Sequence, residues 1–287
     1  MMRRTLLITG GQGMLATDIA AVGEEGGFAV HAFGHAELDV TNPRQVREAM
    51  DAVRPDVVVH TVGLLVDPCE TDPAEAHRVH VWGTGLVARH CERVGATLVH
   101  FSTCGLFGDA VRYYAEDDPV HCKTEYARSK HRAEAEAERW CRRTFTIRPG
   151  WLYGGHVTHK KNFVASRYQE AKREAVLKSA IDKHGCPTWT RDLARGTFAL
   201  AETGEYGCYH LTNQGGGTRY EYVRRIVTAF GLATPVEPVD SSAFPRTAPV
   251  PACELLANRH CGYLGLPPLP PWQDALERYV RQIRAAL

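Results

Sequence analysis

The sequence predicts an α/β fold, a doubly wound parallel sheet with a smaller, interleaved C-terminal lobe. Short apolar runs alternate with helix signals through the first 150 residues. A glycine-rich turn, Gly10 to Gly13, separates the first apolar run from the first helical segment. Regular alternation of this kind is typical of a parallel sheet whose crossover helices cover both faces. The combination predicts a Rossmann-type sheet.

Each element of the first half has its own signal. The run Val57-Val58-Val59 suits a strand buried on both faces, and Asn42-Pro43 places a capping residue before a proline at the first helical position. We expect strands at residues 4–9, 28–33, 56–62, 97–102 and 145–148, and helices at residues 14–22, 43–53, 73–94 and 124–143.

The pattern loosens after Pro149. Helices are expected near residues 163–174, 192–201, 219–230 and 272–286, with short strands between them. The Pro-rich stretch 232–271 suits irregular structure that wraps a site. We therefore predict a dinucleotide-binding Rossmann domain at 1–150, with return segments near 180–210, and a mainly substrate-binding lobe at 151–287.

Composition limits the classes of function. The 287 residues carry a net charge of +1, which leaves no electrostatic footprint for nucleic acid or an anionic membrane. No apolar run has the length of a membrane span. Nine scattered cysteines without a Cys-x-x-Cys pair indicate free thiols in a reducing compartment, so we expect a cytoplasmic protein. His156 and His159 have no acidic or cysteine partner nearby, and no metal site is expected.

The most informative motif pairs Tyr126 with Lys130. Four residues apart on a helix, the two side chains share one face and can reach the same ligand. A lysine ammonium beside the phenol is expected to lower the tyrosine pKa toward neutrality, which would make Tyr126 a usable acid or base. Tyr-x-x-x-Lys also occurs by chance on solvated helices, so its meaning depends on context.

Two upstream features supply that context. The turn from Gly10 to Gly13 lies between a strand and a helix, where backbone N–H groups can hold a pyrophosphate. Thr103 follows the fourth predicted strand, at the carboxyl edge where ligands of parallel sheets bind. Thr103 would polarise a substrate carbonyl and Tyr126 would supply its proton. Lys130 would lower the pKa of Tyr126 and hold the cofactor ribose. The three residues predict a hydride-transfer site.

The end of the second predicted strand bears on cofactor choice. An acidic residue there favours the ribose 2′-hydroxyl of NAD. Gly34 and His35 stand there instead, and the first carboxylate is that of Glu37. The sequence therefore favours NADP(H), with NAD(H) possible.

With these motifs the chain resembles the extended short-chain dehydrogenase/reductases, and among them the dTDP-4-dehydrorhamnose reductase family. The resemblance covers nearly the whole length and rests further on Val66-Asp67-Pro68-Cys69-Glu70-Thr71-Asp72-Pro73, on the segment 148–154, on Lys161-Asn162-Phe163 and on Gly185-Cys186-Pro187-Thr188. It implies NAD(P)H-dependent reduction of a keto group on a nucleotide-linked deoxysugar, with Thr103, Tyr126 and Lys130 as the catalytic trio. The implied cofactor contacts are Gly10, Gln12, Gly13, Met14, Leu15, Asp39, Val40 and Lys130, and the implied substrate contacts are Val66, Cys104, Trp151, Asn162 and His184.

Several pocket positions depart from the family pattern. Cys104-Gly105 stands where the family usually has Asp-Tyr, His80 where an Asn is usual, and Val250-Pro251 where Arg-Pro is usual. We therefore expect a related reductase with a different keto-sugar nucleotide, in a chain that could form a homodimer. The alternatives are an epimerase or dehydratase that retains its cofactor, and a non-catalytic NADP-binding regulatory subunit.

Overall fold

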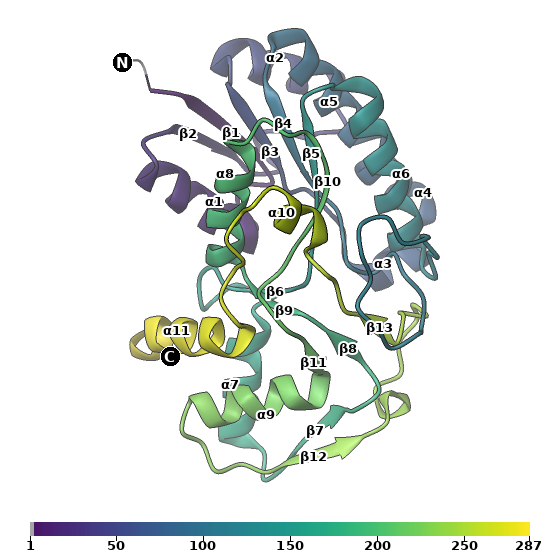
Figure 1. Cartoon of the computed structure of the whole chain (residues 1–287), viewed down its shortest axis with the longest axis vertical. Coiled ribbons are helices and arrows are strands. Elements are labelled where there is room, and N and C mark those ends of the chain that lie inside the picture. The colour runs from purple at the N-terminus through teal and green to yellow at the C-terminus, as the bar shows by residue number, and fades with distance from the viewer. Residues whose placement is uncertain (1–2) are drawn as a thin grey trace.

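A six-stranded parallel sheet forms the upper half of the molecule in Figure 1. The computed structural model describes residues 3–287. The strand order is β10-β5-β4-β3-β1-β2. The strands are β1 (Thr5–Thr9), β2 (Ala29–Phe33), β3 (Val57–His60), β4 (Thr97–Phe101), β5 (Thr144–Pro149) and β10 (Gly207–Leu211). Because β2 and β3 flank β1 on opposite sides, the order reverses there and opens a crevice at the carboxyl ends of β1 and β3.

Helices cover both faces of this sheet. One face packs against α1 (Met14–Glu25) and α8 (Thr190–Ala201), and the other against α2 (Pro43–Val53), α5 (Gly83–Val94) and α6 (Glu125–Trp140). Alternate residues of β1 divide between the two cores, with Leu6 and Ile8 on the first face and Leu7 on the second. All three are fully buried. This two-sided burial explains the continuous apolar runs, and the predicted fold class is confirmed.

The segment predicted as one helix over 73–94 is helical throughout but not uniform. It contains α4 (Pro73–Ala76), a π-helical stretch η1 (His77–Trp82) and then α5. A short helix, α3 (Val66–Thr71), precedes it and was not expected. The π stretch turns His80 toward α6, which matters for the site described below.

A second lobe forms the lower half of Figure 1. Its strands pair as β6 (Trp151–Tyr153) with β9 (Pro187–Trp189), β7 (Leu177–Ala180) with β12 (Val236–Val239), and β8 (His184–Gly185) with β11 (Gly217–Thr218) and β13 (Cys253–Glu254). Its helices are α7 (Phe163–Arg173), α9 (Arg219–Ala229) and α11 (Trp272–Ile283), with single 3₁₀ turns η2 (Ser241–Ala243) and η3 (Arg284–Ala286). The short helix α10 (Arg259–Tyr263) instead packs against β10 of the large sheet. The expectation of irregular structure over 232–271 is wrong in part, since β12, β13 and α10 lie there.

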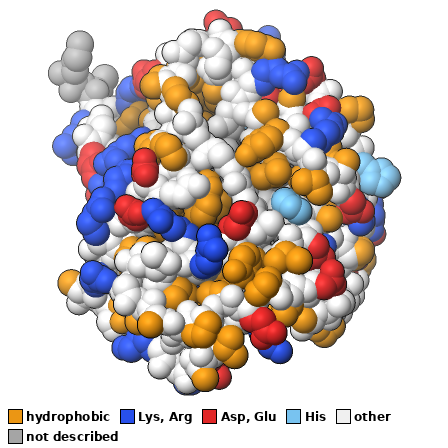
Figure 2. Space-filling view, turned by 60° about the horizontal axis from the view of Figure 1, so that its bottom comes forward, with side chains coloured by type: hydrophobic (Ala, Val, Ile, Leu, Met, Phe, Trp, Pro, Cys, Tyr) orange, Lys and Arg blue, Asp and Glu red, His pale blue; other side chains and the backbone are white. Residues whose placement is uncertain are grey.

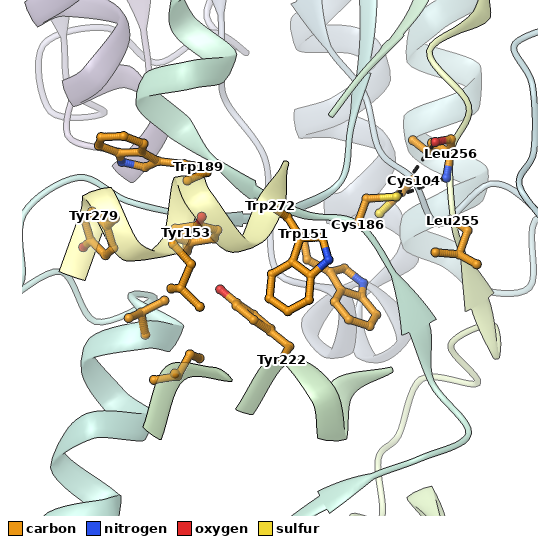
Figure 3. Packing of buried hydrophobic residues seen from close by; sticks show 14 of the residues in the cluster. Cys104, Trp151, Tyr153, Cys186, Trp189, Tyr222, Leu255, Leu256, Trp272 and Tyr279 are labelled. Carbon is orange, nitrogen blue, oxygen red and sulfur yellow. Dashed lines mark hydrogen bonds between the residues drawn. The ribbon is translucent and has the colours of Figure 1, made fainter. Parts of the chain in front are cut away.

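An aromatic core ties this lobe to the sheet layer. Figure 3 shows Trp151, Tyr222 and Trp272 packed together near Cys104 and Cys186. Ring centroids lie 6.5 Å apart for Trp151 and Tyr222, and 5.9 Å apart for Tyr222 and Trp272. The same cluster includes Ala127 of α6 and residues of the loop after β4. The catalytic helix and the lobe therefore share one packed core.

Within residues 3–287, every helix is too short or too polar to cross a lipid bilayer.

Candidate active site

The turn after β1 is shaped by its glycines. Gly10 has a φ of +72°, a conformation that side chains disfavour, and its carbonyl accepts the Gly13 N–H at 2.8 Å. A Cβ on Gly11 would lie 2.9 Å from the Ala32 carbonyl carbon, so only glycine fits against β2. The backbone thus approaches the crevice without side chains in the way.

The first turn of α1 offers free N–H groups to this crevice. Gly13 caps α1 without a side-chain hydrogen bond, and no acidic residue lies in the first turn. By contrast, α2, α6, α7 and α9 have capping side chains that accept N–H groups of their first turns. An uncapped helix N-terminus behind a glycine turn fits the pyrophosphate of a dinucleotide.

The end of β2 does carry a carboxylate. The Glu37 side chain folds back to accept the Gly34 N–H at 2.8 Å, while His35 is exposed. Asp39 lies in the following loop and accepts from the backbone and hydroxyl of Thr41. Burial would raise the pKa of Asp39, but these hydrogen bonds and nearby cations hold it below its ordinary value. Acidic groups therefore border the predicted adenosine end of the cofactor site.

Thr103, Tyr126 and Lys130 meet at the carboxyl end of β4. Lys130 is buried on α6, and its Nζ donates to the carbonyl of Phe101, the last residue of β4, at 2.6 Å. The Thr103 hydroxyl lies near enough to the Tyr126 phenol to influence its pKa, and it accepts the Gly105 N–H at 3.1 Å. The structure thus brings the three predicted catalytic residues together at one sheet edge.

The predicted effect of Lys130 on Tyr126 is wrong in this structure. Burial raises the pKa of Tyr126 well above its ordinary value, and contact with Thr103 offsets this only in part. Lys130 is not among the main causes of this shift, and its ammonium donates to the Phe101 carbonyl. The phenol is therefore held in its protonated form.

Burial also acts on Lys130. It lowers the lysine pKa to about 8, although the Glu134 carboxylate opposes this shift. Glu134 is itself buried and forms two hydrogen bonds, of 2.9 and 2.7 Å, with Arg148 of β5. A charged, buried network thus lies beneath the catalytic helix.

His80 supports the tyrosine from the π-helical stretch. Its ring lies edge-on to Tyr126, with centroids 5.6 Å apart. Nε2 accepts the Leu64 N–H at 2.9 Å, so the proton resides on Nδ1, which donates to Ser129 Oγ at 2.8 Å. Burial, together with the Lys130 and His60 charges, lowers the pKa of His80 to about 3, so the imidazole is neutral. His80 therefore fixes both the loop before α3 and the turn that carries Tyr126.

A cavity of about 770 Å³ lies in the second lobe. Its wall combines aromatic and basic side chains from α7, β7 and α9 with the loop 240–251. Figure 2 shows the face with the second lobe turned forward, where basic side chains gather on the left and hydrophobic ones nearer the centre. The basic residues that line the cavity are Arg167, Lys178, Lys183, Arg219 and Arg246.

Arg219, like Lys178 and Lys183, is a cation of this wall that forms no ion pair with a described carboxylate. Arg167 and Arg246 form ion pairs with Glu170 and Asp67, whereas Arg219 forms none with any described residue. Its guanidinium lies 3.6 Å from the centre of the Trp151 ring. A half-buried guanidinium that lines a cavity and is stacked on an aromatic ring is suited to bind an anion.

The predicted substrate residues divide into two groups. Val66 and Trp151 line the cavity, and Cys104 borders it through a contact with Glu254. Asn162 and His184 are not on its wall. Asn162 is buried and caps α7 by accepting the Ala165 N–H, and His184 forms part of β8. The geometry gives these two residues structural tasks.

Sequence reasoning missed Arg219 and Glu254 as cavity residues. Glu254 accepts the indole N–H of Trp151 at 2.6 Å. Neither residue belongs to a motif, since each reaches the cavity only through tertiary packing of the lobe. Among residues 3–287, no group of three or more His, Cys, Asp or Glu side chains is arranged to hold a metal ion.

The model of the RmlD substrate binding domain matches residues 2–285. The chain belongs to this family. The predicted resemblance is confirmed, and the RmlD match spans both the sheet layer and the lobe.

Two curated relatives of this RmlD-family chain are named as reductases. A dTDP-4-dehydrorhamnose reductase of Streptomyces griseus is 37% identical and matches over 94% of this chain and 91% of its own length. A probable dTDP-4,6-dihydroxy-2-methyloxan-3-one 4-ketoreductase of Streptomyces antibioticus is 35% identical and matches over 98% of this chain and 96% of its own length.

Solved structures of the RmlD family share the fold closely. A dTDP-4-dehydrorhamnose reductase of Clostridium acetobutylicum superimposes with a TM-score of 0.93 at 28% identity, covering 98% of this chain and 99% of that one. The Bacillus anthracis dTDP-4-dehydrorhamnose reductase, determined in complex with NADP, also superimposes with a TM-score of 0.93. It is 27% identical, and the match covers 98% of this chain and 100% of that one.

Proposed function

We propose that this chain is an NADPH-dependent ketoreductase that acts on the 4-keto group of a nucleotide-linked 6-deoxysugar. One observation carries the proposal. Thr103, Tyr126 and Lys130 meet at the sheet edge that also bears the uncapped N-terminus of α1. The function that this site supports is the one named for its reductase relatives.

The residues of the crevice fit a dinucleotide. The backbone from Gly10 to Leu15 would hold the pyrophosphate, and Lys130 would face the nicotinamide ribose. When bound, NADPH supplies the hydride. The Bacillus anthracis relative with NADP supports this cofactor. Glu37 at the end of β2 is compatible with NADH as well.

The raised pKa of Tyr126 suits the direction of reduction. A phenol that stays protonated can donate its proton to the oxygen of the carbonyl as the hydride arrives at carbon. Thr103 donates a hydrogen bond to the same oxygen and stabilises the charge that develops there. Lys130, four residues after Tyr126 on α6, is held at the Phe101 carbonyl and would act on the cofactor ribose rather than on the phenol.

The cavity accounts for the nucleotide-linked part of the substrate. Arg219, with Lys178 and Lys183, would neutralise a diphosphate, and the aromatic wall would pack against a base or sugar. Under this proposal, residues 1–150 bind the cofactor and residues 151–287 mainly bind the sugar nucleotide. A homodimer and a cytoplasmic location remain predictions.

The test is turnover of NADPH with dTDP-4-dehydrorhamnose and related 4-keto-6-deoxysugar nucleotides. The proposal expects one NADP⁺ released for each alcohol formed. Epimerised or dehydrated sugar without net NADPH oxidation would instead indicate an enzyme that retains its cofactor. NADP binding without turnover of any sugar nucleotide would indicate a regulatory subunit.

A further inference from the structure

A carboxylate lies on the cavity wall beside the catalytic residues. Glu254 of β13 accepts the Trp151 indole N–H through Oε2 at 2.6 Å, and its Oε1 lies 3.6 Å from the Cys104 thiol. Both hydrogen-bond partners are neutral. Among residues 3–287 Glu254 forms no ion pair, although its charge acts on the nearby Arg219 and opposes the lowering of the arginine pKa by burial. Since each carboxylate oxygen has two lone pairs, acceptor capacity remains for a ligand.

Gly105 opens the space between this carboxylate and Thr103. A Cβ on Gly105 would lie 3.2 Å from Glu254 Oε1 and 3.5 Å from Thr103 Oγ1. Any larger residue would fill the space that separates the two oxygen atoms. The glycine therefore leaves the acceptor of Glu254 and the hydroxyl of Thr103 facing one small volume.

A cation and a carboxylate both contact Trp151. Arg219 stacks on the face of the indole ring, and Glu254 bonds to its edge. The two charges therefore act on each other across the indole, while Oε1 of Glu254 lies beside Gly105 and near Thr103. A carboxylate here repels an acidic group and attracts a hydrogen-bond donor.

We propose that Glu254 is a specificity-determining residue that accepts a hydrogen bond from the hydroxyl on the sugar carbon next to the reduced carbonyl. The inference rests on the proposed function, because it assumes that Thr103 holds this carbonyl. A site built to bond a hydroxyl rejects the analogue that lacks it, since the acceptor is then left without a partner. Glu254 thereby selects sugars that keep this hydroxyl.

The experiment compares two substrates across variants. The kcat/KM is measured with dTDP-4-dehydrorhamnose and with its 3-deoxy counterpart for the native protein, Glu254→Leu and Glu254→Gln. We expect the native protein to prefer the hydroxylated substrate about 100-fold. In Glu254→Leu the preference should fall to within about threefold, and in Glu254→Gln, which keeps one acceptor, to about tenfold.

Controls separate specificity from structure. Glu237→Leu, on the exposed face of β12, should leave the preference at its native value. The Kd for NADPH should stay within twofold in all variants, which shows that the fold is intact. Equal loss on both substrates in the Glu254 variants would overturn the inference and leave Glu254 as a support for Trp151. Turnover of neither substrate by the native protein would overturn the proposed function and this inference with it.

Discussion

The sheet edge and the second-lobe cavity are built in different ways. At the edge, functional groups come from short segments whose positions follow from the strands, such as the turn after β1 and Thr103 after β4. The cavity takes its wall from residues far apart in the sequence, from Val66 to Glu254. The edge is therefore a property of the fold, whereas the cavity is a property of this particular chain.

The difference extends to electrostatics. Lys130 is directed at a backbone carbonyl, and Glu134 is paired with Arg148, so charges beneath the edge are satisfied within the protein. In the cavity, Arg219 forms no ion pair with any described residue and Glu254 hydrogen-bonds only to neutral groups, although the two charges act on each other. Unpaired charges on a cavity wall indicate where a ligand completes the structure.

The largest expected effect comes from removing a catalytic side chain at the sheet edge. Tyr126→Phe removes the proton donor and should lower kcat about 1,000-fold. The Kd for NADPH should change less than twofold, because the phenol makes no contact with the turn after β1. Steady-state kinetics and fluorescence titration measure the two quantities. The exposed Tyr263→Phe is the matched control and should behave as native; full activity in Tyr126→Phe would remove this residue from the mechanism.

The second effect belongs to the cavity. Arg219→Met keeps the stacking on Trp151 but removes the charge, and should raise the KM for the sugar nucleotide about 50-fold with kcat nearly unchanged. Arg224→Met, on the exposed side of the same helix, should leave both constants unchanged. A fall in kcat at constant KM would instead indicate that Arg219 takes part in the chemical step. It would contradict the division between catalysis at the sheet edge and substrate binding in the cavity.

The third prediction concerns pH and the buried lysine. Because the pKa of Lys130 is lowered to about 8, the unfolded chain binds more protons at this position between pH 8 and the ordinary lysine pKa. The cost of burying the ammonium is complete below pH 8 and is relieved as pH rises. Relative to Lys130→Met, the native free energy of unfolding should therefore rise by about 2 kcal/mol between pH 8 and pH 10. Urea unfolding of both cofactor-free proteins measures the difference between their free energies of unfolding. A difference that does not change with pH would contradict the lowered pKa of Lys130.

The smallest effect tests the glycine turn. Gly10→Ala forces a side chain into a φ of +72° and against Thr61, and should cost about 1–2 kcal/mol of stability and weaken NADPH binding about tenfold. Gly27→Ala, with a φ of +82° and open space around it, isolates the backbone strain. Thermal unfolding should reveal a loss in both variants, and calorimetry a weaker Kd in Gly10→Ala alone. Equal NADPH binding in the two variants would separate the turn from the cofactor.

The sheet edge could be predicted from the sequence far better than the second-lobe cavity. Alternating apolar runs predict the sheet because burial on both faces requires them, and Tyr126 with Lys130 is legible because helical spacing places both on one side. The pKa of Tyr126 could not be predicted, because it depends on burial and on where the Lys130 ammonium points. Arg219 and Glu254 have no local signal, since each meets the cavity only when α9 and β13 pack against Trp151.

The most direct test of the central claim follows the hydride. With NADPH deuterated at the transferred position and a 4-keto-6-deoxysugar nucleotide, we predict one deuterium on the former carbonyl carbon of the product and one NADP⁺ released per turnover, measured by mass spectrometry and NMR. Sugar product without deuterium, or with no net oxidation of NADPH, would contradict the assignment of this sheet edge to ketone reduction.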